Sequence, residues 1–255
     1  MRILITGGAG YIGSVLCQHL LARGYGVRCL DSAIYHNDLS ILSLASSKNF
    51  EYMAGDLCDP DIFSEALNEV SDVVLLAGLV GDPITKNFPE AAHQVNDSGH
   101  DTMLECLRGR RLNKVIFIST CSNYGLVERD QLADEAFELN PLSLYAKSKV
   151  RIEKRLLDRR DVEPDYTPTV LRFATAFGLS PRMRFDLTVS EFTRDMFIGK
   201  DLLVFDAETW RPYCHVQDFS EVIRRVLEAP QETVAFEVFN AGGDENNFTK
   251  QMIVD

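Results

Sequence analysis

Short apolar runs alternate along this chain with stretches of helical spacing. The first run covers residues 2–6, and from Tyr11 apolar positions recur every three or four residues, which predicts a helix. Further strands are expected at residues 27–31, 50–54, 73–77, 114–119, 169–173 and 236–240, and further helices near 60–70, 89–108 and 142–159. Near-continuously apolar strands joined by helices predict a parallel sheet covered on both faces. Since such crossovers are right-handed, the expected fold class is α/β with a doubly wound sheet.

Glycines occupy the point where the first strand becomes the first helix, in the segment TGGAGYIG. Gly7 permits a tight turn, Gly10 lets the backbone approach another group closely, and Gly13 lets the helix pack on the strand. The unpaired N–H groups at a helix start, here beside Tyr11 and Ile12, favour an anion such as a pyrophosphate. A glycine-rich turn without any ligand is the alternative.

An acidic residue, Asp31, ends the second expected strand. In a dinucleotide-binding Rossmann unit, an acid at this separation from the glycines accepts hydrogen bonds from the adenosine ribose. A carboxylate there repels a 2′-phosphate, so NAD is expected rather than NADP. A plain turn residue is the alternative.

Two further strand ends supply candidate cofactor contacts. Asp56 and Leu57 follow the third strand, where they could meet the adenine; Asp56 could equally cap the helix ahead of Pro60. The fourth strand ends in small or apolar residues that could pass under a cofactor or form an ordinary turn, namely Leu76, Ala77 and Gly78.

Candidate chemistry lies in the segment LYAKSK. Tyr145 and Lys149 are four residues apart in an expected helix and therefore share one face. A tyrosine phenol has an ordinary pKa near 10, so proton exchange near neutral pH needs a neighbouring positive charge, which Lys149 can supply. Thr120, at the end of the fifth strand, offers a hydroxyl to hold a substrate oxygen.

Composition excludes several function classes. The chain has 255 residues, 45% of them hydrophobic, and a net charge of −12, which argues against nucleic acid as a partner. Charged residues interrupt every apolar stretch before it reaches membrane-spanning length, so no membrane partner is expected. Six cysteines without a CxxC pair favour free thiols in a reducing cytoplasm and no metal site.

The motifs TGGAGYIG, STCSNYG, YAKSK and WRPYCHVQD together resemble the extended short-chain dehydrogenases/reductases, in particular the NAD-dependent nucleotide-sugar epimerase/dehydratase family. The resemblance implies a Rossmann-like NAD-binding domain over residues 1–174 and a smaller substrate-binding portion over 175–255, interleaved with the last sheet strands. After Phe177 we expect loops around one helix at 188–198. The resemblance assigns Tyr145 as general acid/base, Lys149 as its partner and a ribose ligand, and Thr120 as hydroxyl donor. It assigns substrate contacts to Arg184, Asp186 and Arg211, the last at the nucleotide diphosphate.

Departures from the family pattern bear on the reaction. Dehydratases and decarboxylases of this family carry carboxylates where this chain has Cys121 and Ser122. The expected activity is therefore epimerisation at C4 of a nucleotide-sugar through a transient 4-keto intermediate. One-way redox at C4 is the first alternative; dehydration, a non-catalytic NAD sensor and a scaffold protein on the same fold are further ones.

Assembly and chain length give two more expectations. The resemblance implies a homodimer through the helices near 89–108 and 142–159, and the apolar residues expected to supply the contact are Met103, Leu104, Leu107, Leu156 and Leu157. The last residues, NFTKQMIVD, resemble the start of a helix that relatives continue, which predicts either a truncated chain or a shortened member of the family.

Overall fold

A single parallel sheet organises the larger part of the molecule. The computed structural model describes residues 1–127, 131–158 and 166–255, and within them the sheet has seven strands in the order β3-β2-β1-β4-β5-β6-β9. The strands are β1 (Arg2–Thr6), β2 (Gly26–Asp31), β3 (Phe50–Ala54), β4 (Asp72–Leu75), β5 (Lys114–Thr120), β6 (Thr167–Phe173) and β9 (Glu237–Ala241). All neighbours pair in parallel, which confirms the doubly wound α/β fold.

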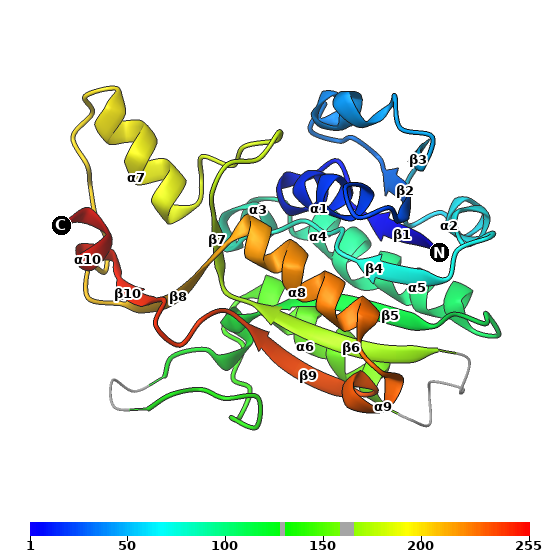
Figure 1. Ribbon diagram of the computed structural model, residues 1–255. Helices are drawn as coiled ribbons and strands as arrows, with labels where there is room; N and C mark the ends of the chain where they lie inside the picture. The colour runs from blue at the N-terminus through cyan, green and yellow to red at the C-terminus, as the bar shows by residue number, and fades with distance from the viewer. Residues whose placement is uncertain (128–130, 159–165) are drawn as a thin grey trace.

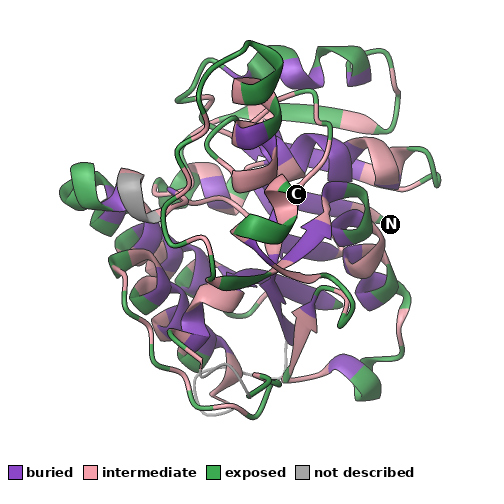
Figure 2. Cartoon of the chain, turned by 90° about the vertical axis from the view of Figure 1, so that its left-hand side faces the viewer, coloured by how far each residue is buried: buried purple, intermediate pink, exposed green. Residues whose placement is uncertain are grey.

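Helices cover both faces of this sheet (Figure 1). One face packs against α1 (Tyr11–Leu21) and α8 (Val216–Glu228), and the other against α2 (Pro60–Ala66), α5 (His100–Leu107) and α6 (Leu144–Leu157). Every residue of β5 and β6 is buried, because these strands lie inside the sheet with helices on both sides. Figure 2 looks onto the carboxyl ends of the strands and shows this buried layer between partly exposed helices.

A smaller sheet lies beyond those carboxyl ends. It has the order β10-β8-β7, from β7 (Thr175–Phe177), β8 (Trp210–His215) and β10 (Asn247–Thr249), and it carries α7 (Thr188–Phe197) and α10 (Lys250–Val254). The expectation of a loop at WRPYCH was wrong, because that segment is β8, parallel to β7 and antiparallel to β10. Its strand signal is weak in the sequence because only Tyr213 and Cys214 of this strand are buried.

Other elements are short: η1 (Asp38–Leu44), α3 (Asp82–Asn87), η3 (Cys121–Tyr124) and α9 (Gln231–Val234).

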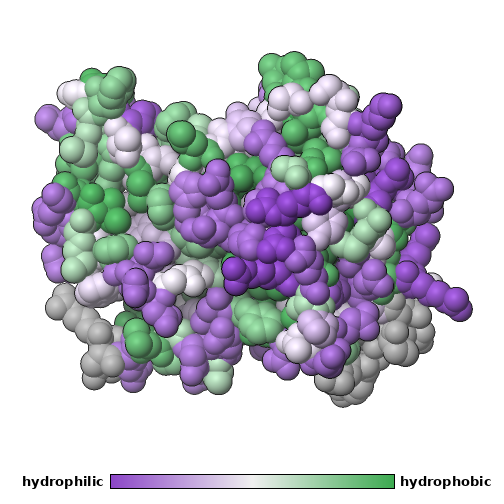
Figure 3. Space-filling view, in the orientation of Figure 1, coloured by the Kyte–Doolittle hydropathy of each residue, from purple (hydrophilic) through white to green (hydrophobic). Residues whose placement is uncertain are grey.

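The part of the chain around the smaller sheet exposes large apolar side chains in and after α7, on the left of Figure 3. They are Met196, Phe197, Ile198, Leu203 and Phe205.

The expected helix near 89–108 is not uniform. It consists of α4 (Pro89–His93), a π-helical turn η2 (Gln94–Gly99) and α5. Asn96 turns inward from η2, and its side chain bonds both backbone groups of Leu79, in the loop after β4. A Cβ at Gly99 would come within 2.7 Å of side-chain atoms of Leu57 and Cys58, so this turn packs tightly. A π-turn is frequent near functional sites, and here it fixes the loop after β4.

The apolar residues expected to form a dimer contact do not lie on the surface. Four of them are buried in the protomer's own core between α5, α6 and the sheet, and Leu157 packs partly against it; the four are Met103, Leu104, Leu107 and Leu156. The prediction that these apolar residues supply a dimer contact was wrong, because the apolar stripe of each helix faces the sheet of its own protomer.

Candidate active site

The glycine loop has the geometry of a tight strand-to-helix connection. Gly7 has φ +73°, and its N–H donates to the carbonyl of Leu30 at 2.8 Å. A Cβ at Gly13 would lie 2.2 Å from the carbonyl oxygen of Gly7, so only glycine lets α1 pack this closely. Gly10 is the N-cap of α1 and has no side chain to cap the first turn. The loop therefore presents helix-start N–H groups to a ligand without a competing side chain.

Asp31 holds this loop from β2. Its two carboxylate oxygens accept from the backbone N–H groups of Ala9, at 2.9 Å, and Ala33, at 2.8 Å. The carbonyl of Ala9 accepts in turn from the side chains of Asn37 and Ser40, at 2.8 and 2.7 Å. A carboxylate has about four acceptor positions, so Asp31 can still accept from ribose hydroxyls.

The sequence reasoning missed Asn37 and Ser40. The only sequence signal for these two contacts is an Asn and a Ser soon after a strand, and that pattern equally indicates a turn. Oδ1 of Asn37 is buried and finds no partner in the part of the chain that the structure describes. Such an orphaned acceptor beside Asp31 fits a hydroxyl-bearing ligand.

The loops after β3 and β4 carry further candidate cofactor residues, and one alternative for them was wrong. The cap of α2 is Asp59, which accepts from the N–H groups of Asp61 and Ile62, so the alternative of Asp56 as that cap was wrong. Asp56 instead forms a turn through the N–H of Cys58 at 2.9 Å and stays exposed. Leu57 is half-buried.

The loop after β4 is fixed to β1. The N–H groups of Leu76 and Ala77 both donate to the Thr6 hydroxyl at 3.1 Å. A Cβ at Gly7 would lie 2.9 Å from Cα of Ala77, and one at Gly78 would lie 3.0 Å from Oδ1 of Asn96. The loop formed by the half-buried residues Leu76, Ala77 and Gly78 therefore lies directly beside the glycine loop.

Helix α6 positions the candidate catalytic pair. Ser143 caps its start by accepting from the N–H of Ala146 at 3.2 Å, and Tyr145 and Lys149 follow one turn apart. Nζ of Lys149 lies 5.9 Å from the centroid of the Tyr145 ring and donates to the carbonyl of Ile118 at 2.7 Å. Lys149 is 4% exposed, and burial lowers its pKa to about 7, while the carboxylate of Glu153 acts in the opposite direction. Its charge is therefore sensitive to its neighbours.

Thr120 lies two residues beyond Ile118 on β5. Its hydroxyl accepts from the N–H of Ser122 at 3.2 Å and starts the short η3 turn. Because the carbonyl of Ile118 anchors Lys149, the structure brings Thr120, Tyr145 and Lys149 to one strand end. Cys121 beside them is half-buried. Burial raises the pKa of its thiol, although the charge of Arg211 acts in the opposite direction.

The residues expected to bind substrate are arranged less simply. Arg184 and Asp186 form an ion pair with each other, with Nε 3.0 Å from Oδ1, and this hydrogen bond lowers the pKa of Asp186. Arg211 is exposed on β8, and its charge reaches Cys121 just after the end of β5.

Tyr11 joins the two parts of the chain. Its ring is buried and its hydroxyl donates to the carbonyl of Gly178 at 2.7 Å, while Ser180 donates to the carbonyl of Tyr11 at the same distance. The Tyr11 hydroxyl is thus already hydrogen bonded within the protein. The predicted cofactor contacts of Tyr11 and of the half-buried Ile12 are therefore contacts of their backbone N–H groups.

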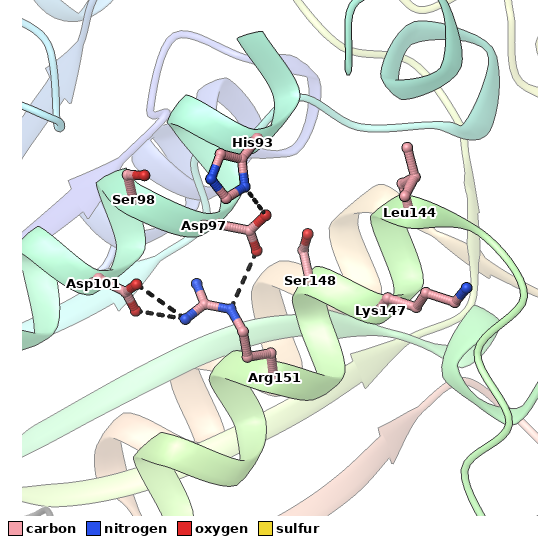
Figure 4. A pocket seen from close by; sticks show the side chains of 8 residues that line it. All are labelled: His93, Asp97, Ser98, Asp101, Leu144, Lys147, Ser148 and Arg151. Carbon is pink, nitrogen blue, oxygen red and sulfur yellow. Dashed lines mark hydrogen bonds and ion pairs between the residues drawn. The ribbon is translucent and has the colours of Figure 1, made fainter. Parts of the chain in front are cut away.

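A separate groove of about 450 Å³ lies between η2 and α6 (Figure 4). Arg151 extends across it and bonds Asp97 at 3.2 Å and Asp101 at 2.8 Å, while His93 bonds Asp97 at 2.8 Å. Arg151 lies on a different face of α6 from Tyr145 and Lys149. The acidic residues of the groove, Asp97 and Asp101, are already paired with arginines, so this groove is not the candidate active site.

Within the described ranges, no group of three or more His, Cys, Asp or Glu side chains could hold a metal ion. Nor does any described helix combine the length and apolarity needed to cross a lipid bilayer. All six cysteines are free thiols, as expected.

The fold, the glycine loop and the Tyr/Lys pair on α6 define the class: this protein is an enzyme of the extended short-chain dehydrogenase/reductase type. Residues 3–242 match the model of the NAD dependent epimerase/dehydratase family, and the chain belongs to that family. The predictions of an enzyme and of NAD as cofactor are thereby confirmed at the level of the family.

Individual relatives agree with this assignment. The chain is 30% identical to a UDP-glucose 4-epimerase of Yersinia enterocolitica and 27% identical to one of Bacillus subtilis, in both cases over 95% of this chain and 77% of the relative.

Two solved structures are similar over nearly the whole chain. A UDP-glucose 4-epimerase of Thermus thermophilus in complex with NAD has a TM-score of 0.84 and 26% identity, and the match covers 100% of this chain and 81% of that one. A UDP-glucuronic acid 4-epimerase of Bacillus cereus, in complex with UDP-glucuronic acid and NAD, has a TM-score of 0.87 and 29% identity over 98% of this chain and 79% of that one.

Proposed function

We propose that this protein is an NAD-dependent epimerase that inverts C4 of a nucleotide-sugar through a transient 4-keto intermediate. The observation that carries the proposal is the bond from Lys149 to the carbonyl of Ile118, which brings a buried ammonium group beside Tyr145 and next to Thr120. Relatives named as 4-epimerases of UDP-sugars support it.

The cofactor would be held along the carboxyl ends of β1 to β4. The backbone of Gly7, Gly10 and Gly13 would face the pyrophosphate, and Asp31 the adenosine ribose. Further contacts would come from Asp56, Leu57, Leu76, Ala77 and Gly78, and Lys149 would bind the second ribose. When bound, NAD supplies the acceptor for the C4 hydride and the donor that returns it.

Tyr145 would act as the general acid/base. As phenolate it removes the proton of the C4 hydroxyl while the C4–H bond breaks, and as phenol it gives that proton back to the keto oxygen. The ammonium of Lys149 favours the phenolate, and the hydroxyl of Thr120 hydrogen bonds the sugar oxygen throughout. Inversion requires that the keto sugar presents its other face before the hydride returns.

The neighbours of Thr120 favour this reaction over dehydration. A dehydratase needs a group that abstracts a proton at C5, and this chain offers Cys121 and Ser122 at the expected positions. Because burial raises the pKa of the Cys121 thiol, that thiol stays protonated near neutral pH and is a poor base.

On the substrate side, Arg211 would contact the nucleotide diphosphate, for which its planar guanidinium is suited. Arg184 and Asp186 would line the nucleotide as the ion pair that they form with each other. We further propose a homodimer through the outward faces of α5 and α6. There Arg151 and Arg155 pair with Asp101, so charged residues would replace the apolar contact first expected.

The test is conversion of UDP-glucose and UDP-glucuronic acid by the NAD-loaded protein. The expected result is a mixture of C4 epimers of unchanged mass with no lasting absorbance of reduced nicotinamide. A product lighter by one water molecule would indicate a dehydratase, and reduced nicotinamide accumulating with product would indicate one-way oxidation. No conversion of these or other nucleotide-sugars would contradict the proposal.

A further inference from the structure

An ion pair lies fully inside the protein beneath the candidate active site. Glu153 of α6 is 2% exposed and Arg172 of β6 is 5% exposed. Nη2 of Arg172 lies 2.8 Å from Oε2 of Glu153, and Nε lies 3.2 and 3.3 Å from its two oxygens. Removing two charges from water is costly even when they pair, so an apolar pair of similar volume is often the more stable choice. Stability alone therefore does not account for this pair.

Glu153 lies one turn along α6 from Lys149, which itself lies one turn from Tyr145. Residues four apart share a helix face, so the three side chains form one row. On that row Glu153 also reaches β5: its Oε1 accepts from the hydroxyl of Ser119 and, at 2.7 Å, from Nδ2 of Asn123.

Ser119 connects the pair to the catalytic strand end. It lies between Ile118, whose carbonyl holds Lys149, and Thr120. Nδ2 of Asn123 also donates to the Ser119 hydroxyl at 3.0 Å. The carboxylate of Glu153 thus bonds the residue directly before Thr120 and lies beside Lys149 on the same helix.

Arg172 keeps Glu153 in place from the other side. Its Nη1 donates to the hydroxyl of Tyr124 at 3.0 Å and to the carbonyl of Glu135 at 3.2 Å. The Tyr124 hydroxyl donates to Oδ1 of Asn240 at 2.7 Å. Because the guanidinium is bonded on both edges, its position and that of the carboxylate are fixed.

Several groups face the ammonium of Lys149. From α6 these are Tyr145 and Glu153, and from β5 the carbonyl of Ile118 and the ring of Phe117, 4.6 Å away at its centroid. From α5 comes His100, whose ring contacts the same Phe117. Behind Glu153, Arg172 of β6 bonds the carboxylate.

His100 is neutral in this setting. Its burial and the charge of Lys149 lower the pKa of its imidazole to about 3, and its Nδ1 lies 3.2 Å from the carbonyl of Val95. Among these described neighbours of Lys149, Glu153 is therefore the one that supplies negative charge.

We propose that Glu153 is a positioning residue for the reaction: held by Arg172, it keeps Lys149 charged and fixes the strand end that carries Thr120. This inference rests on the proposed function, since it needs Tyr145 as the acid/base. With Glu153 in place, burial lowers the pKa of Lys149 to about 7 against the opposing effect of that carboxylate. Losing the carboxylate would lower the pKa of Lys149 further and leave it largely neutral at pH 7. The phenolate of Tyr145 would then form only at higher pH.

The test is a pH titration of the Tyr145 phenolate in the NAD-loaded protein. Its ultraviolet absorbance is obtained as the difference between each protein and the same protein carrying Tyr145→Phe. Glu153→Gln removes the charge and keeps the shape. The double variant Glu153→Gln with Arg172→Met also avoids leaving a buried arginine unpaired. Glu221→Gln on α8, a glutamate that likewise bonds an arginine, is the control.

Both variants at Glu153 should raise the pH of phenolate formation by about one unit, a tenfold change in the ionisation constant. The control should leave it unchanged. A second arm uses Ser119→Ala, which keeps the charge and removes the link to β5; it should leave the titration in place and lower kcat by about tenfold.

The possible outcomes separate the two proposals. If wild-type Tyr145 titrates near neutral pH but neither folded variant shifts it, Glu153 is a structural residue and this inference is overturned. If wild-type Tyr145 does not ionise below its ordinary range, the proposed function fails first, and this inference fails with it. Circular dichroism establishes which variants are folded.

Discussion

Nζ of Lys149 lies 2.7 Å from the carbonyl oxygen of Ile118, so helix α6 is hydrogen bonded to the strand that ends in Thr120. This bond joins a lysine and an isoleucine that are 31 positions apart in the chain. Lys149→Met breaks it and removes the charge that favours the Tyr145 phenolate. We expect losses in both turnover and NAD affinity, measured by single-turnover hydride transfer and by calorimetry. Unchanged NAD affinity would contradict a role of Lys149 in binding the cofactor.

Tyr145→Phe removes the phenol and keeps the ring. Since general acid/base catalysis contributes about 10²- to 10⁴-fold, hydride transfer from the nucleotide-sugar should slow by that order while NAD still binds. A rate within twofold of the wild-type protein would show that another group carries the proton, and Cys121 would be examined next.

Thr120→Val should cost less than Tyr145→Phe. It removes one hydroxyl that accepts from the N–H of Ser122 and would hold the sugar oxygen, while the proton carrier stays in place. We expect a loss of about tenfold to a hundredfold in kcat/KM. Ser122→Ala, which leaves the backbone N–H in place, is the matched control and should have a smaller effect.

Asp31 should select NAD over NADP by at least about tenfold in affinity, or 1.4 kcal/mol. The carboxylate repels a 2′-phosphate, and it also bonds the N–H groups of Ala9 and Ala33. Asp31→Asn should therefore reduce both the preference and the melting temperature. Calorimetry with each cofactor measures the first, and equal affinities in the wild-type protein would remove Asp31 from this role.

His100 should make the protein sensitive to acid. Its pKa is lowered to about 3 in the folded state, against an ordinary value near 6.5, so the unfolded chain binds more protons between these values. Stability is therefore full above about pH 6.5 and is lost as the pH falls towards 3. The cost from this group is about 2 kcal/mol at pH 5. His100→Leu should show a smaller loss of unfolding free energy between pH 7 and pH 5 in urea titrations, and an identical loss would contradict the prediction.

Local sequence determined the alternation of strands and helices, the glycine loop with Asp31 after it, and the pairing of Tyr145 with Lys149 on one helix face. Each is a pattern over a few residues or one strand–helix–strand unit, where chain geometry alone decides which side chains meet. These features were readable for that reason.

Tertiary packing decided the rest. Several features depend on elements that are distant in sequence. They are the ion pair of Glu153 with Arg172, the partners of Asn37 and Asn96, the strand at Trp210–His215, and the burial of Met103 and Leu107. A charged residue such as Glu153 in a helical pattern is predicted to face solvent, because the neighbouring sequence does not show that a distant strand will place an arginine beside it. Burial of such groups depends on how the elements pack, and that is a property of the folded chain as a whole.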